Sequence, residues 1–196
     1  ELFAPNPSIF KGRQRVLLTL AMDRLGMAQA LFDAGCDVTL GDFLYILNVP
    51  LPLKSLKTLA RLARILAPIV VQLPFSMIYP TGEKQGENKP RQARYFLEND
   101  IIAGDFHFIH RYMPPELPGK IVITNTVTRD DVRYLKERGV KTLVATTPEM
   151  EGRSFGTNIM EALLVSLAGS NKELSEDQYD RMLEDLKFTP RIEELQ

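Results

Sequence analysis

The sequence lacks the features that mark secreted, membrane and nucleic-acid-binding proteins. It has one cysteine, Cys36, so an internal disulfide is excluded and a reducing compartment is indicated. No apolar run approaches the roughly 18 residues of a membrane span, because Pro68 and Pro74 interrupt the best candidate. The 24 Lys and Arg nearly balance 25 Asp and Glu, which leaves no general field for a polyanion. These absences predict a soluble cytoplasmic protein that binds neither a membrane nor nucleic acid.

The N-terminus lacks the basic region followed by an apolar one that marks a signal peptide. The first residue is Glu1 rather than methionine, which is compatible with a longer polypeptide. A chain of 196 residues has the length of one domain. We expect residues 1–170 to form an α/β domain and residues 171–196 to form a C-terminal helix and tail packed on it.

Five apolar, β-rich segments recur along the chain, and most are followed by a helical pattern. They span residues 15–21, 37–42, 100–105, 120–125 and 141–147. Continuous rather than alternating apolar strands predict a sheet buried on both faces, and therefore a parallel one. The fold class we predict is α/β, with an open, doubly wound, Rossmann-like sheet of about five strands and a C-terminal helical extension.

Helix boundaries can also be predicted from single residues. Gly35 follows the first helical pattern, where a helix stops, while Thr128 and Gly139 bracket another as N-cap and terminator. The segment "FHFIHRYM" is expected as a short helix or a loop. The segment "NKELSEDQYDRMLEDLKF" predicts the C-terminal helix.

Polar residues gather where the predicted strands end. The segments there are "MDRLG", "GDF", "GDFHFIH", "NTVT" and "TTPEMEGRSFGTN", whereas the loops leading into the strands are brief. Ligands bind doubly wound sheets beyond the carboxyl ends of their strands. The sequence therefore predicts a small-molecule site at this edge.

The turn after the first strand departs from a dinucleotide fingerprint. Of the three glycines of G-x-G-x-x-G, only Gly26 is present, and Asp23 would repel a pyrophosphate unless Arg24 compensates. A plain strand–turn–helix connection is the alternative. Asp42 ends the second strand, where an acid can accept both ribose hydroxyls of an adenosine, or serve as an ordinary turn residue.

Two histidines lie three residues apart in "GDFHFIH". With Asp105, His107 and His110 could hold a metal, but the sequence offers no further ligand, so we predict no metal site. Substrate binding or a structural role are the alternatives for the two rings. A basic stripe on residues 54–64 is expected to be the solvated face of an amphipathic helix.

The segment "EGRSFGTN" precedes the last helix-periodic run. Free backbone N–H groups of Gly156, Thr157 and Asn158 would favour an anion, and Arg153 would add a bidentate donor. Alternatively, Ser154 or Thr157 caps the helix while Arg153 pairs with a nearby glutamate. We expect the anion or cofactor contact, with Arg153 in the same cleft as residues 105 and 125.

Three segments, "RVLLTLAMDRLGMAQALFDAGCDVTLGD", "IIAGDFHFIHRYMP" and "ITNTVTRDDVRYLKERGVKTLVATTPEMEGRSFGTN", resemble bacterial proteins labelled quinate or shikimate 5-dehydrogenase-like. The resemblance covers nearly all of the chain and implies that it is mainly the Rossmann-like part of a longer protein. It implies NAD or NADP as cofactor, with Asn125 and Thr126 on the nicotinamide side. The acid–base Lys and Asp of such enzymes lie in the other domain, so no catalytic residue is carried over.

The leading hypothesis is an NAD(P)-dependent dehydrogenase of a cyclic polyol acid, with this chain supplying the dinucleotide site. The alternative is a non-catalytic Rossmann-like domain that binds another anionic metabolite. A nucleotide-dependent methyltransferase is disfavoured, because the first loop lacks the glycines expected there too. Apolar side chains in the proline-rich region 45–80 suggest the contacts of a homodimer.

Overall fold

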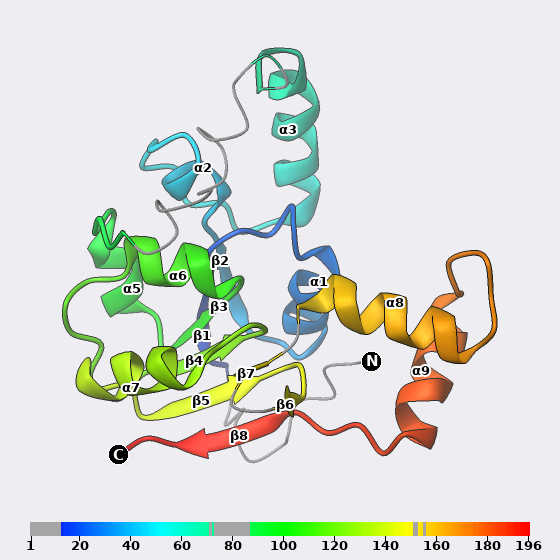
Figure 1. Cartoon of the computed structure of the whole chain (residues 1–196). Coiled ribbons are helices and arrows are strands. Elements are labelled where there is room, and N and C mark those ends of the chain that lie inside the picture. Colours follow the sequence, from blue (N-terminus) through cyan, green and yellow to red (C-terminus); the bar gives the residue numbers. More distant parts are fainter. Residues whose placement is uncertain (1–12, 71, 73–86, 151–152, 155) are drawn as a thin grey trace.

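The computed structural model of the chain describes residues 13–70, 72, 87–150, 153–154 and 156–196. Five strands run parallel: β1 (Arg15–Leu18), β2 (Asp37–Leu40), β3 (Ile101–Ala103), β4 (Ile121–Thr124) and β5 (Thr142–Ala145). A sixth, β8 (Arg191–Glu194), pairs antiparallel with β5, and the sheet order is β2-β1-β3-β4-β5-β8. The predicted open, mainly parallel α/β sheet is confirmed (Figure 1).

Helices connect the strands and cover both faces of the sheet. They are α1 (Leu25–Asp33), α2 (Asp42–Tyr45), α3 (Leu56–Val70), α5 (Ala93–Glu98), α6 (Phe106–Tyr112), α7 (Arg129–Glu137), α8 (Thr157–Leu167) and α9 (Glu176–Asp185). In Figure 1, α5, α6 and α7 lie together on one side of the sheet, and α1 lies on the other. The segment "FHFIHRYM" forms the short helix α6, which is one of the two alternatives that its sequence predicts.

Successive residues of each strand face opposite cores, as expected of a sheet covered on both faces. In β1, Leu17 packs with Phe108 and Leu135 from the side of α6 and α7. Its neighbours Val16 and Leu18 join the second core with Leu31 of α1. The continuous apolar character of the strands follows from this burial.

Predicted helix boundaries agree with the structure. Thr128 caps α7 with a capping box, in which its side chain and that of Asp131 each bond to the other's backbone N–H. Gly35 and Gly139 adopt φ angles of +77° and +79° just past their helices. Cys36 is buried, and burial raises the pKa of its thiol.

The C-terminal part differs from the prediction in one respect. Helix α9 forms as expected, but the tail after it returns to the sheet as β8 rather than packing as an extension. Its sequence, Arg-Ile-Glu-Glu, has one apolar residue among three charged ones over only four positions, so no periodic pattern predicts a strand. Pairing with β5 supplies the missing stabilisation.

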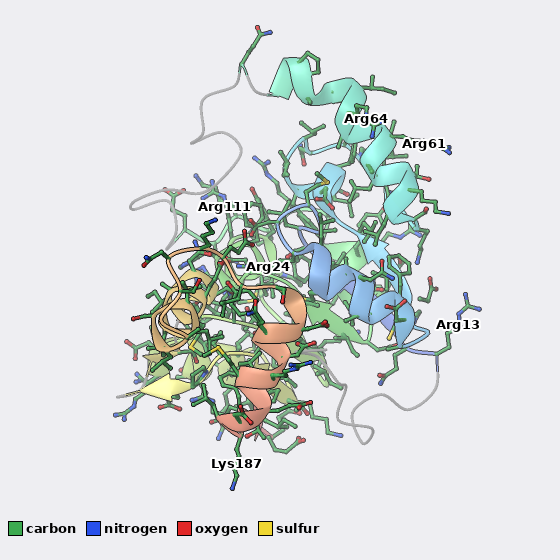
Figure 2. The ribbon with its side chains drawn as sticks, turned by 90° about the vertical axis from the view of Figure 1, so that its right-hand side faces the viewer. Arg13, Arg24, Arg61, Arg64, Arg111 and Lys187 are labelled. Carbon is green, nitrogen blue, oxygen red and sulfur yellow. The ribbon has the colours of Figure 1, made fainter. Side chains whose placement is uncertain are left out.

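Helix α3 stands away from the body of the molecule in Figure 1, and Figure 2 shows Arg61 and Arg64 on it, pointing outward. Lys54 lies just before the helix, and its Nζ is 2.8 Å from Oδ1 of Asp37 in β2. The basic stripe is therefore a solvent-facing surface, as predicted. Within the described ranges, no helix combines the length and apolarity needed to cross a membrane.

Candidate functional site

A cavity of about 330 Å³ opens at the carboxyl edge of the sheet. The turn between β1 and α1, the residues that follow β4 and β5, and the helices α8 and α9 surround it. Its lining consists of Asp23, Arg24, Leu25, Gly26, Met27, Asn125, Thr146, Thr147, Thr157, Met160, Glu161, Leu164, Tyr179, Leu183 and Phe188. The order of strands reverses at β1, which pairs with β2 on one side and β3 on the other, so the cavity adjoins the switch point where doubly wound folds bind ligands.

Arg24, the N-cap residue of α1, belongs to the lining of this cavity and is labelled in Figure 2. Its Nη2 donates to Oδ2 of the buried Asp105 at 3.0 Å, and its Nη1 lies 3.4 Å from Oγ1 of Thr157. The second oxygen of Asp105 accepts from the backbone N–H of His107 and so caps α6. The guanidinium is thereby fixed between three elements, and its Nε–H has no hydrogen-bond partner.

Asn125 links the end of β4 to the start of α8. The side-chain Nδ2 of Asn125 donates to Oγ1 of Thr157 at 3.2 Å. The hydroxyl of Thr147 donates to the backbone carbonyl oxygen of Asn125 at 2.9 Å. The side-chain oxygen Oδ1 of Asn125 is buried and has no hydrogen-bond partner. The hydroxyls of Thr124 and Ser154 are also buried and also lack a partner. Buried polar atoms without partners are rare and costly, and they are often found at functional sites.

Two helix N-termini meet at the cavity without a side-chain cap. Helix α8 has Gly156 as its N-cap and helix α1 has Arg24, and neither cap residue makes a side-chain hydrogen bond to the first turn. The predicted start of the last helix at residues 156–158 is confirmed, with neither Ser154 nor Thr157 as cap. Free N–H groups in a first turn carry partial positive charge and attract anions.

Two acidic side chains also belong to the lining. Asp23 is about half exposed, with Oδ2 3.7 Å from Nε of Arg24. Glu161 of α8 is exposed and accepts from the hydroxyl of Tyr179 at 3.3 Å. Two carboxylates and one guanidinium are thus the charged groups of the described lining, and the guanidinium is already paired with Asp105.

Gly26 lines the cavity in the first turn of α1. A Cβ placed on it would meet no atom within 4 Å, so the packing of the protein does not require glycine here. The position therefore tolerates a side chain, which provides a way to alter the cavity while the fold is kept.

Asp42 lies beneath the turn rather than at the cavity. Its two oxygens accept from the backbone N–H groups of Ala21 and Met22 at 3.1 and 2.9 Å, and the residue is 4% exposed. Burial raises the pKa of the Asp42 carboxyl, and the two N–H donors oppose that rise. Both oxygens hold the β1–α1 turn, so Asp42 serves here as a turn residue, the second of the two roles that its sequence position allows.

Neither histidine belongs to the lining of the cavity. His107 lies in the first turn of α6, and His110 packs its ring 4.7 Å from that of Tyr134 on α7. Burial lowers the pKa of His110. Among the described residues, no group of three or more His, Cys, Asp or Glu side chains could hold a metal ion.

A two-stranded hairpin follows β5, formed by β6 (Glu149–Met150) and β7 (Arg153–Ser154). The side chain of Arg153 lies outside the described part of the structure, so its predicted direction stays a prediction. Glu149, one of the two glutamates near Arg153 in the sequence, forms an ion pair with Arg191 of β8. Thr126 lies beside Gly156, with its Oγ1 3.9 Å from the position of a Cβ on that glycine.

Comparison with known families adds one finding. Residues 2–195 match the family model described as a domain of unknown function, DUF8754. The chain belongs to this family. No curated protein and no solved structure matches the chain.

In this DUF8754 chain, the site includes an apolar wall that the sequence analysis did not assign to it. Met160 and Leu164 of α8, Leu183 of α9 and Phe188 form that wall. Part of this wall could be found in the sequence, because Met160 and Leu164 lie four residues apart, the spacing of one helix face. Periodicity alone cannot distinguish a face that packs on the sheet from one that borders a cavity.

Proposed function

We propose that this chain binds a small metabolite through a carboxylate or phosphate group in the cavity at the carboxyl edge of the sheet. The observation that carries the proposal is the fixed position of Arg24, held by Asp105 and Thr157 between two uncapped helix N-termini. Charge-assisted hydrogen bonds from a guanidinium and first-turn N–H groups are strong anion contacts. The volume of about 330 Å³ is near the lower end of the roughly 300–1,000 Å³ range of small-molecule sites.

The test is a thermal-shift and calorimetry panel on the purified chain. The panel contains inorganic phosphate, quinate, shikimate, nucleoside monophosphates and the α-amino acids. We expect at least one anion-bearing compound to raise the melting temperature, because a molecule that binds only the folded state stabilises it. Two variants, Gly26→Gln and Leu164→Phe, reduce the cavity from opposite sides and should abolish that shift. A shift that survives in both folded variants, or no shift with any compound, would refute the proposal.

The second candidate is the NAD(P)-dependent dehydrogenase of a quinate- or shikimate-like acid. The position of the cavity at the β1–α1 turn supports it, since this turn contacts the pyrophosphate in dinucleotide-binding folds. The strand order of the five parallel strands, 2-1-3-4-5, and the engagement of Asp42 by the turn favour the first candidate. Titration with NAD, NADP and their reduced forms separates the two, and dissociation constants above millimolar would exclude the dinucleotide.

Two further proposals concern the protein in the cell. The single buried Cys36 supports a cytoplasmic location, which recovery from a secreted or membrane fraction would contradict. Exposed apolar side chains at Val49, Leu51 and Ile65 support homodimer contacts in region 45–80. A monomer by light scattering at high concentration would contradict the dimer.

A further inference from the structure

Both hydrogen-bond donors and hydrogen-bond acceptors border the cavity, and two of them, Nε of Arg24 and Oδ1 of Asn125, have no hydrogen-bond partner. On the donor side are the Nε–H of Arg24 and the first-turn N–H groups of α8, which has no side-chain cap. On the acceptor side are the buried Oδ1 of Asn125 and the carboxylates of Asp23 and Glu161. A simple anion satisfies only the first set, and it would lie near two carboxylates that repel it.

The charges of the described lining also disfavour a simple anion as the ligand. Arg24 is paired with Asp105, so its positive charge is largely compensated. The remaining attraction for an anion comes from the N-termini of α1 and α8, each equivalent to about half a positive charge. Asp23 and Glu161 oppose it with a full negative charge each, weakened by their exposure to solvent.

Most of the remaining lining is apolar, with Thr146, Thr147, Thr157 and Tyr179 as its polar members. Met160, Leu164 and Leu183 from α8 and α9, with Phe188 after α9, form a wall with few hydrogen-bonding groups. A bound molecule therefore needs an apolar body as well as its charged end.

We infer that the cavity takes a zwitterion with an apolar body, that is, an apolar α-amino acid or a close analogue. The carboxylate lies at Arg24 and the start of α8, the ammonium group at the acceptors Asp23, Asn125 and Glu161, and the side chain against the apolar wall. This inference rests on the proposed binding of an anionic group, and it adds the requirement for a positive charge on the same molecule.

A matched set of three probes tests the requirement. L-phenylalanine, 3-phenylpropionate and 2-phenylethylamine share one apolar body and differ in the presence of the ammonium or carboxylate group. A second set, L-leucine, 4-methylpentanoate and 3-methylbutylamine, repeats the comparison with a smaller body. Dissociation constants come from calorimetry or ligand-observed NMR on the purified chain. We expect the amino acid of at least one set to bind at least tenfold more tightly than both of its analogues.

The outcomes separate this inference from the proposed function. If a carboxylate analogue binds as tightly as its amino acid, the zwitterion inference is wrong and the anion site stands. If an amine analogue binds most tightly, both are wrong. If no member of either set binds, the inference is wrong, and the proposed function is decided by its own panel.

Variants identify the source of the preference. The double variant Asp23→Asn with Glu161→Gln should weaken the binding of L-phenylalanine about tenfold. It should leave the binding of 3-phenylpropionate unchanged or make it tighter. The control pair, Glu116→Gln with Glu137→Gln, removes two exposed carboxylates that do not line the cavity and should change neither constant. Equal effects of the two double variants would refute the role of Asp23 and Glu161, and with it the inference.

Discussion

Asp42 accepts a hydrogen bond of 2.9 Å from the backbone N–H of Met22, a residue that precedes it by 20 positions. Its other oxygen accepts from Ala21, so one buried carboxylate fixes the whole turn between β1 and α1. This turn also carries Asp23 and Arg24 to the cavity. The geometry of the candidate site thus depends on a residue that does not line it.

Replacement of Asp42 should therefore affect stability first. Asp42→Ala leaves two backbone N–H groups without acceptors. Each unsatisfied group costs about 1–3 kcal/mol, so we expect a loss of about 2–6 kcal/mol in the free energy of unfolding. Urea unfolding measures it, and the exposed Asp33→Asn should change the value by less than about 0.5 kcal/mol. A variant with unchanged stability and lost affinity for NAD would instead support the ribose contact.

Gly104 follows β3 and lies against Thr19. Its φ angle is +135°, and a Cβ at this position would be 2.3 Å from Oγ1 of Thr19. Backbone strain of about 1–3 kcal/mol and overpacking of a similar amount should make Gly104→Ala lose more than about 3 kcal/mol. Gly26→Ala is the control, since it meets no atom within 4 Å and should be neutral or stabilising by up to about 1 kcal/mol. Thermal unfolding of the two variants makes the comparison, and equal melting temperatures would contradict it.

His110 should make stability depend on pH. Burial lowers the pKa of His110 in the folded state, Asp131 opposes the effect, and Arg138 and His107 add to it. The unfolded chain therefore binds a proton more readily, so the stability is complete above the ordinary pKa of about 6.5 and falls as the pH drops below it. Denaturant unfolding from pH 7.5 to 5.5 should show a smaller loss in His110→Gln. His107→Gln is the matched control, and an equal reduction in both would contradict the assignment to His110.

Tyr45 is fully buried between aromatic rings, with its hydroxyl lacking a hydrogen-bond partner. Its ring lies 5.2 Å from that of Tyr112 and 5.6 Å from that of Phe96. Tyr45→Phe keeps these contacts and removes an unsatisfied group, so stability should be unchanged or rise by about 1 kcal/mol. Tyr134→Phe is the contrast, because it removes the contact of its hydroxyl with Arg138 and should destabilise the protein. Chemical unfolding decides, and a loss of more than about 1 kcal/mol in Tyr45→Phe would show that the hydroxyl is bonded.

The extent to which the sequence predicts this fold can be judged from individual elements. Long apolar runs and local signals such as Thr128 determine β1 to β5 and the ends of α7, and these are predicted correctly. Strand β8 is missed, because Arg191, Glu193 and Glu194 have little strand preference until β5 pairs with them.

The candidate site shows the same division. The polar strand ends correctly indicate where the cavity lies, since parallel strands bring their carboxyl ends to one edge. The direction of the Asp42 side chain depends on a turn far away in the sequence. The choice between ribose contact and turn residue therefore required the three-dimensional structure.

Strand β8 has a consequence for the behaviour of the protein in concentrated solution. Without it, the edge of β5 would present four consecutive buried residues, Thr142–Ala145, as an open template for another molecule. With it, the outermost strand carries Arg191, Glu193 and Glu194, and charged edges discourage pairing between molecules. The last strand thus protects the sheet against intermolecular β-aggregation, and this protection is in place only once the end of the chain has folded onto β5.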